Sequence, residues 1–213
     1  MKNGLRAFGI YFIFMCCFGA TDAFAQSDRS GFELRAGLVI PIFSGASTVV
    51  DDYGLSGKAL SAVGVGVDIQ AMYRWAYFGL GVQQTIAGVF ATNDTLIDIK
   101  YGEVKDFFRK GDGAFYGGSF FMLKEYIPFA GNHMITIGEG IGVTYGANKE
   151  NRKLYSSDSD LALAIKGDLG YVYFIEGIYG VGLNIDCTLS FALGNGVSTS
   201  YAVTPSVVFD MVF

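Results

Sequence analysis

The chain has 213 residues, of which 51% are hydrophobic and only 16% are charged, and its formal net charge is −5. This acidic balance argues against a nucleic-acid partner, because contacts with phosphates need clustered Lys and Arg side chains. The 30 glycines, 19 phenylalanines and 13 tyrosines indicate a β protein rich in aromatic residues rather than a helical one.

The first 25 residues have the form of a secretory signal peptide. Lys2 and Arg6 precede an apolar run over residues 7–20, and Ala23, Phe24 and Ala25 give the small-x-small pattern that signal peptidase accepts. We therefore expect residues 1–25 to be cleaved and residues 26–213 to form one domain. The run is short for an uncleaved transmembrane anchor.

Cysteine usage limits the chemistry of the mature chain. A lipoprotein signal at Cys16 or Cys17 would need a small residue where Met15 stands. After cleavage only Cys187 remains, so no intramolecular disulfide and no cysteine-based metal site is expected.

Eight segments alternate between apolar and small or polar residues with the period of two that is typical of β-strands. The expected strands cover residues 32–40, 63–75, 78–90, 114–127, 134–145, 161–173, 179–191 and 201–213. In the fourth segment Phe120, Phe121 and Met122 place apolar groups on both faces, which leaves its phase open. In the fifth, the apolar phase also points Glu139 at lipid, so a bulge, a shifted register or a protonated acid is expected there.

Side-chain size indicates which face of these strands is outside. A soluble lipocalin-like barrel would show the same alternation with its apolar face inward. Here the polar faces carry mostly Gly, Ala, Ser, Thr and isolated charges, which suit a cramped lumen, whereas the other faces carry large Tyr, Phe, Leu and Ile. The sequence thus predicts an all-β, eight-stranded antiparallel up-and-down transmembrane β-barrel.

Loop length predicts the orientation of the barrel. The connections near Trp75, Asn132 and Glu176 are short and are expected to be periplasmic, whereas residues 43–60, 91–112, 146–160 and 192–200 form longer connections expected outside the cell. Residues 96–104 alternate as well, which would let the third and fourth strands project above the membrane.

Two sets of side chains follow from this topology. Eight inward charges are predicted to form an ion-pair network that fills the lumen, a functional proton or ion path being the alternative: Glu33, Arg35, Asp68, Arg74, Lys166, Asp168, Asp186 and Asp210. Nine aromatic residues near the short turns are predicted to form an interfacial girdle: Tyr73, Trp75, Tyr77, Phe78, Tyr126, Phe129, Tyr171, Tyr173 and Tyr179.

No catalytic, cofactor or metal residue is predicted. His133 is the single histidine and is expected at the periplasmic rim, away from lipopolysaccharide, so a lipid-modifying enzyme would lack a nucleophile and base pair. The glycine-rich segments 64–66 and 138–142 lie inside strands and precede no helix, so a nucleotide-binding loop is not indicated. The acidic and serine-rich run over residues 156–160 is expected to be a solvated loop, with calcium binding or contact with a host surface as alternatives.

The last strand carries a resemblance. Counted back from Phe213, every second residue to Tyr201 is apolar or aromatic, a pattern that resembles the final strand of bacterial outer-membrane β-barrels, whose terminal Phe is read by the barrel-insertion machinery. In pattern and topology residues 32–213 are similar to the small OmpX or OmpW-like class. The resemblance implies a Gram-negative outer-membrane location, lipid and the barrel-assembly machinery as partners, and a structural, surface-interaction or adhesion role for the loops. The alternative is a narrow channel or transporter of small or hydrophobic molecules.

Overall fold

A computed structural model describes residues 30–46, 61–93, 95–100, 103–108, 110–129, 131–148, 161–192 and 198–213. The expected signal peptide, residues 1–25, and the acidic and serine-rich run, residues 156–160, lie outside these ranges. No helix in the described part of the chain is long and apolar enough to cross a membrane.

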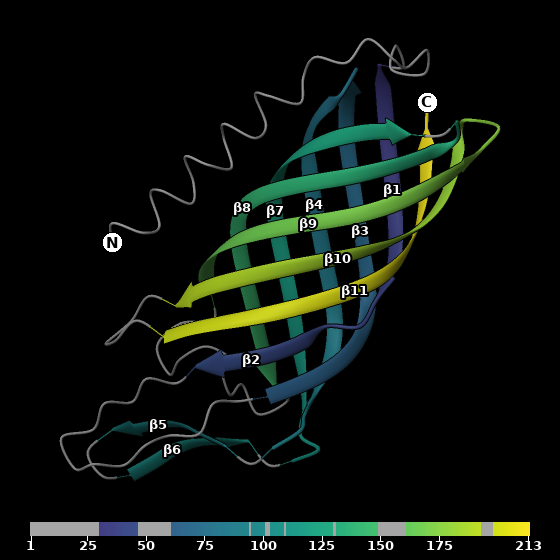
Figure 1. Cartoon of the computed structure of the whole chain (residues 1–213). Coiled ribbons are helices and arrows are strands. Elements are labelled where there is room, and N and C mark those ends of the chain that lie inside the picture. The colour runs from purple at the N-terminus through teal and green to yellow at the C-terminus, as the bar shows by residue number, and fades with distance from the viewer. Residues whose placement is uncertain are drawn as a thin grey trace.

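In the described ranges, nine strands form one closed antiparallel sheet, and two more form a separate hairpin. The barrel strands are β1 (Gly31–Val39), β2 (Ile42–Ala46), β3 (Ser61–Trp75), β4 (Phe78–Ala91), β7 (Gly113–Phe129), β8 (His133–Asn148), β9 (Leu161–Ile175), β10 (Tyr179–Ala192) and β11 (Ser198–Val212). Both β1 and β2 pair with β3 on one side and β11 on the other. Together they therefore occupy one strand position, here called a stave, in the wall of the barrel. The result is a closed barrel of eight staves, as predicted, with β9, β10 and β11 crossing in front of β1, β3 and β4 in Figure 1.

The first stave is longer than the sequence pattern indicated. A loop was expected from residue 43, but the stave continues beyond a break at Ile40 and Pro41 and reaches Ala46. Proline has no backbone N–H to give to the ladder, which explains the interruption. The backbone still holds across it, because the Ile40 N–H donates to the Pro205 carbonyl at 3.0 Å and the Gly64 N–H donates to the Pro41 carbonyl at 3.0 Å.

The strand register defines the tilt of the barrel. Following Cα partners once around, from His133 through Tyr173, Val181, Phe209, Ala36, Ile69, Gln84 and Ser119, leads back to β8 at Val143. Val143 lies ten residues beyond His133, so the eight staves have a shear of ten. With the usual rise and spacing of β-strands, this shear gives a strand tilt of about 40°.

The three tight turns lie at one end of the barrel, as expected. They join β3 to β4, β7 to β8 and β9 to β10, and two of them place a non-glycine residue at positive φ, Ala76 at 52° and Glu176 at 53°. The strand ends that flank the longer connections lie at the opposite end, which is the extracellular end of an outer-membrane barrel. Figure 1 shows the C-terminus at the periplasmic end.

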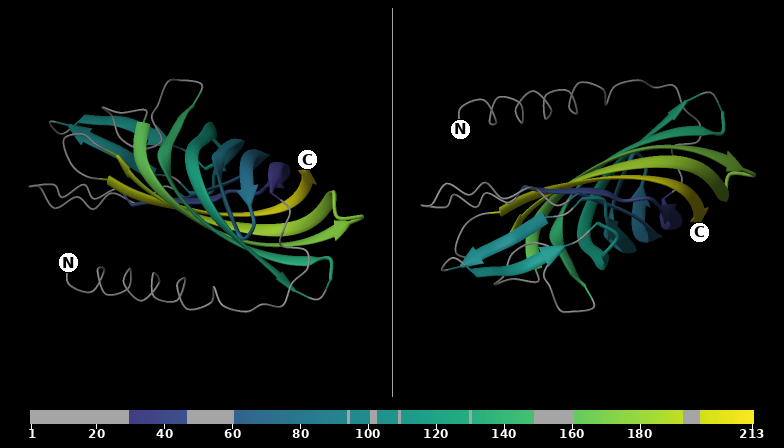
Figure 2. Two further views of the ribbon diagram at one scale, coloured as in Figure 1. Left: turned by 90° about the horizontal axis from the view of Figure 1, so that it is seen from above. Right: turned by 90° about the horizontal axis from the view of Figure 1, so that it is seen from below.

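The alternating pattern of residues 96–104 had suggested that the largest connection extends the third and fourth strands of the barrel. The structure shows that it does not. Strands β5 (Thr95–Lys100) and β6 (Glu103–Phe108) pair only with each other, with register shifts between them, and form a two-stranded sheet of their own. Figure 2 shows this hairpin beyond one end of the barrel.

Pairing with both neighbours settles the two strands whose phase the sequence left open. In β7 the even-numbered residues Phe120, Met122 and Lys124 are buried in the lumen, while Phe121 is exposed on the outer wall. In β8 the ladder to β7 and β9 runs without a register shift. Neither a bulge nor a shifted register therefore removes Glu139 from the outer wall, where its side chain is exposed.

Candidate functional site

The lumen gathers the ionisable side chains that the sequence placed on the inner face. All eight predicted residues are buried there, each no more than 5% exposed. Lys124, which the sequence reading missed, is fully buried beside them. The described lumen thus holds five acids, Glu33, Asp68, Asp168, Asp186 and Asp210, and four bases, Arg35, Arg74, Lys124 and Lys166. Buried charges are tolerated only when they are paired and hydrogen-bonded.

The strongest ion pair joins β1 to β11 across the closing seam of the barrel. Arg35 and Asp210 are direct register partners, and the Arg35 guanidinium donates through Nε to Asp210 Oδ1 at 2.5 Å and through Nη2 to Oδ2 at 2.9 Å. Such a two-point contact is the geometry in which arginine binds carboxylates best. Glu33 Oε1 lies 3.8 Å from Arg35 Nη2, so one guanidinium serves two carboxylates.

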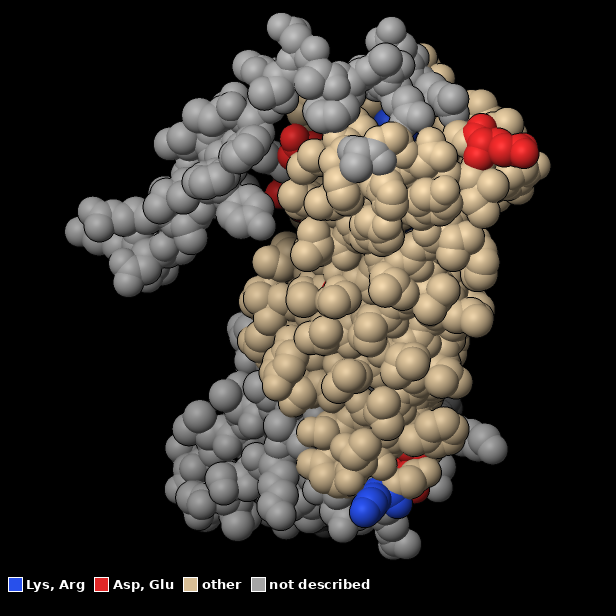
Figure 3. Space-filling model, turned by 45° about the vertical axis from the view of Figure 1, so that its right-hand side comes forward, with Lys and Arg blue, Asp and Glu red and all other residues tan. Residues whose placement is uncertain are grey.

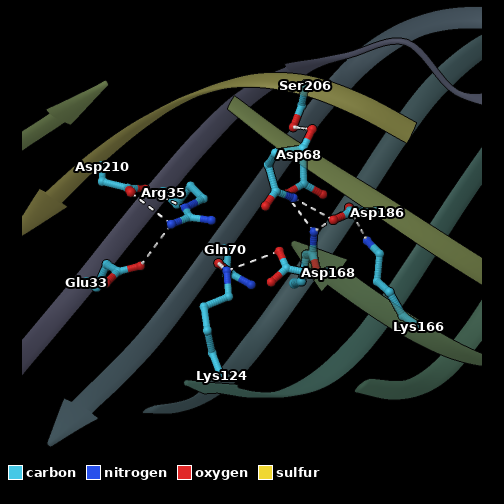
Figure 4. Close-up of polar contacts among 12 residues, drawn as sticks. Glu33, Arg35, Asp68, Gln70, Lys124, Lys166, Asp168, Asp186, Ser206 and Asp210 are labelled. Atoms are coloured by element: carbon cyan, nitrogen blue, oxygen red, sulfur yellow. Dashed lines mark hydrogen bonds and ion pairs between the residues drawn. The ribbon is translucent and has the colours of Figure 1, made fainter. Parts of the chain in front are cut away.

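A second cluster joins side chains from β7, β3 and β9. Lys124 Nζ donates to Gln70 Oε1 at 2.7 Å and lies 3.3 Å from Asp168 Oδ2. Figure 4 shows Lys124 reaching into the lumen between these two side chains. Lys124 therefore ties three staves together by a single ammonium group.

A third cluster is built around Asp186. Lys166 Nζ lies 2.7 Å from Asp186 Oδ2, and the Gln83 amide donates to both Asp186 and Asp68 at 3.1 and 2.9 Å. The Thr85 hydroxyl donates to Asp68 at 2.6 Å. Figure 4 shows Asp68 and Lys166 pointing toward Asp186 from different strands of the barrel.

Two like charges face each other in this arrangement. Asp168 and Asp186 are direct cross-strand partners of β9 and β10, a placement that is destabilising by itself. Each has its own lysine, Lys124 for Asp168 and Lys166 for Asp186, and the lysines come from different strands. This division of cations keeps the pair of carboxylates tolerable in the lumen.

The buried charged side chains run along the lumen as a polar column, and Arg74 lies at its periplasmic end. Its guanidinium lies 4.5 Å from the centroid of the Tyr126 ring and donates through Nε to the Ala76 carbonyl at 3.2 Å. Tyr126 is only 1% exposed, so its assignment to the interfacial girdle was wrong. The unresolved phase of β7 caused this error, because one residue of shift moves a side chain to the other face.

Apolar layers bracket the polar column at both ends. At the extracellular end Phe43 and Tyr116, with ring centroids 6.1 Å apart, pack among six buried small residues: Ala62, Ala87, Val89, Ala91, Ala162 and Ala202. At the periplasmic end Tyr126, Met134, Val172, Phe174 and Val208 form a second layer. A third group in between contains Met72, Phe120, Met122 and Ala164. The lumen is therefore packed by side chains, as in other eight-stranded barrels.

The outer wall is largely apolar and ends in aromatic residues at the periplasmic end. Eight residues predicted for the girdle are at least 36% exposed: Tyr73, Trp75, Tyr77, Phe78, Phe129, Tyr171, Tyr173 and Tyr179. His133 lies among them, with its Nδ1 2.7 Å from the Tyr171 hydroxyl and its ring 5.1 Å from that of Tyr173. Figure 3 shows a wide band of uncharged side chains between charged residues near the two ends. Such a belt matches the hydrocarbon layer of a membrane.

The terminal residue is held against the first strand. The Phe213 N–H donates to the Phe32 carbonyl at 2.8 Å, and the Phe32 N–H donates to the Phe213 carbonyl at 3.3 Å. Its ring is 69% exposed on the outer wall. Recognition of this residue by the assembly machinery stays a prediction. Within the described ranges, no group of three His, Cys, Asp or Glu side chains is placed to hold a metal ion.

Comparisons with known proteins give the fold. No family model and no curated protein sequence matches the chain. Among solved structures, the outer membrane protein OprG of Pseudomonas aeruginosa is 15% identical with a TM-score of 0.53, the match covering 88% of this chain and 98% of OprG. Neisserial surface protein A is 13% identical with a TM-score of 0.54, covering 86% of this chain and 98% of that one. Likeness at these identities shows a shared fold.

Proposed function

We propose that this protein, a small eight-stranded outer-membrane β-barrel, is a non-conducting and non-enzymatic membrane scaffold that presents its extracellular loops to a surface partner. The observation that carries the proposal is the filling of the lumen. The lumen contains three ion-paired clusters, whose charged side chains are at most 5% exposed. Apolar layers close the lumen at the extracellular and periplasmic ends. A barrel packed in this way serves as a stable wall rather than as a path.

The energetics of the lumen support a closed barrel. A passing ion would have to separate contacts such as that between Arg35 and Asp210, in which both side chains are at most 2% exposed. Breaking one buried pair of this kind costs about 3–5 kcal/mol. The ion would then meet the ring pair of Phe43 and Tyr116, which offers no polar replacement for its hydration shell.

The distribution of chain length supports a role for the loops. The periplasmic turns contain two or three residues, whereas the sequence between the strand ends at the extracellular side is longer, as between Ala46 and Ser61, between Asn148 and Leu161, and between Ala91 and Gly113, where the β5–β6 hairpin is found. Binding residues concentrate on loops that a rigid scaffold positions. The chemistry of the partner is therefore expected to be read from these extracellular segments.

Two measurements test the proposal. Purified, folded protein in planar lipid bilayers is expected to give no discrete conductance steps at either polarity, and well-defined steps would instead support the alternative, a narrow channel. Cells that express the protein are expected to gain binding to a host surface or matrix, and to lose it when residues 95–108 are replaced by a Gly-Ser linker. The matched control is a Gly-Ser replacement of the periplasmic turn at residues 176–178, which should leave binding intact. Equal binding by all three forms would contradict a loop-based role.

A further inference from the structure

The outer wall of the barrel is not uniform around its circumference. The outward side chains of β1, of β3 from Val63, and of β11 from Val203 to Met211 are all apolar or aromatic. The opposite side, formed by β4, β7 and β8, carries Gln84, Ser119 and Glu139 on its outer face. Polar groups that face hydrocarbon are costly and mark functional surfaces.

Glu139 is the sharpest of these features. Its side chain is exposed on the outer wall, and in the described part of the chain that side chain makes no hydrogen bond or ion pair. Its register partner on β9 is Gly167, at which an added Cβ would meet nothing within 4 Å. Together with Ile137, Ile165 and Leu169, the two residues line a shallow depression of about 540 Å³. The carboxylate therefore stands among apolar side chains without a group of its own barrel to satisfy it.

Three polar side chains, Gln84, Ser119 and Tyr145, are hydrogen-bonded to one another on the same face, and Gln84 lies two staves away from Glu139. The Ser119 hydroxyl donates to Gln84 Oε1 at 2.5 Å, and the Gln84 amide donates to the Tyr145 hydroxyl. Gln84 and Ser119 line a second depression of about 420 Å³, together with Val82 and Phe121. Tyr145 keeps its own O–H as a donor, and Gln84 Oε1 keeps a lone pair as an acceptor.

Glu139 and Gln84 lie at nearly the same depth in the membrane. With a shear of ten over eight staves, each step to the next Cα partner rises about 3 Å, and each residue along a strand rises about 2.5 Å. Gln84 is six such steps from His133, and Glu139 is six residues along the strand from His133. The two side chains therefore lie about 19 and about 15 Å above the periplasmic rim, near the middle of an apolar band about 25 Å tall.

We propose that the face formed by β4, β7 and β8 is the interface between two copies of this chain in the membrane. Both copies insert in the same orientation, so their twofold axis must run along the membrane normal, and residues meet partners of equal depth. An axis passing over β7 places β8 of each copy opposite β4 of the other. Glu139 then reaches the polar group at Gln84 of the second copy, and the same contact is repeated by symmetry.

The other components of the membrane fit this face less well than a second copy does. Acyl chains offer no hydrogen-bonding group to Glu139, and lipid headgroups lie at the wrong depth. Phe121 on β7 lies about 17 Å above the rim by the same register and falls on the proposed axis, where its 53% exposed ring would pack on its copy. An isologous contact needs a surface that is complementary to itself. This face meets that need, because the acceptor Glu139 and the polar group at Gln84 lie on either side of the apolar Phe121.

Disulfide cross-linking of the full chain in native membranes tests this interface. Cys187→Ser provides a background without the exposed native thiol. In that background Phe121→Cys is expected to give an oxidised product of twice the monomer mass. The matched control is Val207→Cys on β11, which lies on the opposite side of the barrel at nearly the same depth and is 43% exposed. It is expected to stay monomeric.

A second comparison tests the role of Glu139 in the same assay. Adding Glu139→Leu to Phe121→Cys is expected to remove the dimer, whereas Glu139→Gln, which keeps a hydrogen-bonding side chain, is expected to retain it. Each variant must first show the folded, heat-modifiable band on a gel. Cross-linking of Val207→Cys as strongly as Phe121→Cys, or no dimer from either, would overturn the proposal. So would an unchanged dimer with Glu139→Leu, or a cross-linked band of another mass, which would assign the face to a different membrane protein.

Discussion

Removal of the Arg35 guanidinium should destabilise the barrel more than removal of its nearest carboxylate. Arg35 contacts Asp210 through two hydrogen bonds and Glu33 at 3.8 Å, and all three side chains are at most 2% exposed in these pairs. Arg35→Met leaves two buried carboxylates without the cation that contacts them. We expect a loss of about 3–5 kcal/mol in the free energy of unfolding, the range seen when one partner of a buried pair is removed.

Asp210→Asn should have a smaller effect, because Glu33 remains beside Arg35 to balance its charge. The loss of one charge-assisted contact predicts about 1.5–3 kcal/mol. Leu34→Met, one residue away but 40% exposed on the lipid side, is a matched control expected to stay within about 0.5 kcal/mol of the wild type.

The assay is urea unfolding of the barrel in lipid vesicles, followed by the shift between folded and unfolded bands on an unboiled gel. A loss of 3–5 kcal/mol corresponds to a midpoint lower by roughly 2 M urea. Two results would refute the reasoning. One is a loss below about 1 kcal/mol for Arg35→Met, and the other is a loss for Asp210→Asn that equals or exceeds it.

Three further predictions use the same protein in vesicles. Gly182→Ala is expected to lower the free energy of unfolding by about 1–3 kcal/mol, because its Cβ would overlap the carbonyl oxygen of Tyr171. Gly167→Ala, whose Cβ would meet no atom within 4 Å, should change the free energy of unfolding by less than about 0.5 kcal/mol. Equal losses for the two variants in urea titrations would contradict this contrast. Lys124→Met should cost about 3–5 kcal/mol, since it strips the partner from a buried carboxylate 3.3 Å away, and a loss under about 1 kcal/mol would place this lysine outside the network. Trp75, the single tryptophan, should be quenched more by lipids brominated near the headgroup than by lipids brominated at the chain end, and the reverse order would contradict its interfacial position.

The alternation of side chains was enough to predict most of the fold. Strands such as β9 and β10 follow the period of two without interruption, so their inward and outward sets are already visible in the sequence. The inward position of Lys166, Asp168 and Asp186 follows from that period alone. The pairing of charges does not, because Arg35 and Asp210 are 175 residues apart and meet only when the barrel closes.

Two of the errors, both in β7, have a common physical origin in local ambiguity. In β7 three consecutive apolar residues, Phe120 to Met122, fit either phase, so the sequence concealed Lys124 as a lumen cation and misplaced Tyr126 on the girdle. Only the ladders to β4 and β8 define which side chains face inward. The same ladders leave Glu139 on the outer wall, where an irregularity had been an expected alternative.

The most direct test of this account measures which side chains of β10 contact hydrocarbon. Spin labels would be placed one at a time, in the Cys187→Ser background, at Val181, Leu183 and Ile185 and at Asn184, Thr188 and Ser190 of the protein folded in lipid vesicles. The first three positions are exposed on the wall and should collide with oxygen dissolved in the acyl chains, whereas the last three are buried in the lumen and should be shielded. Oxygen accessibility that is reversed between the two sets, or that shows no alternation, would contradict a barrel with an apolar outside and a packed polar lumen.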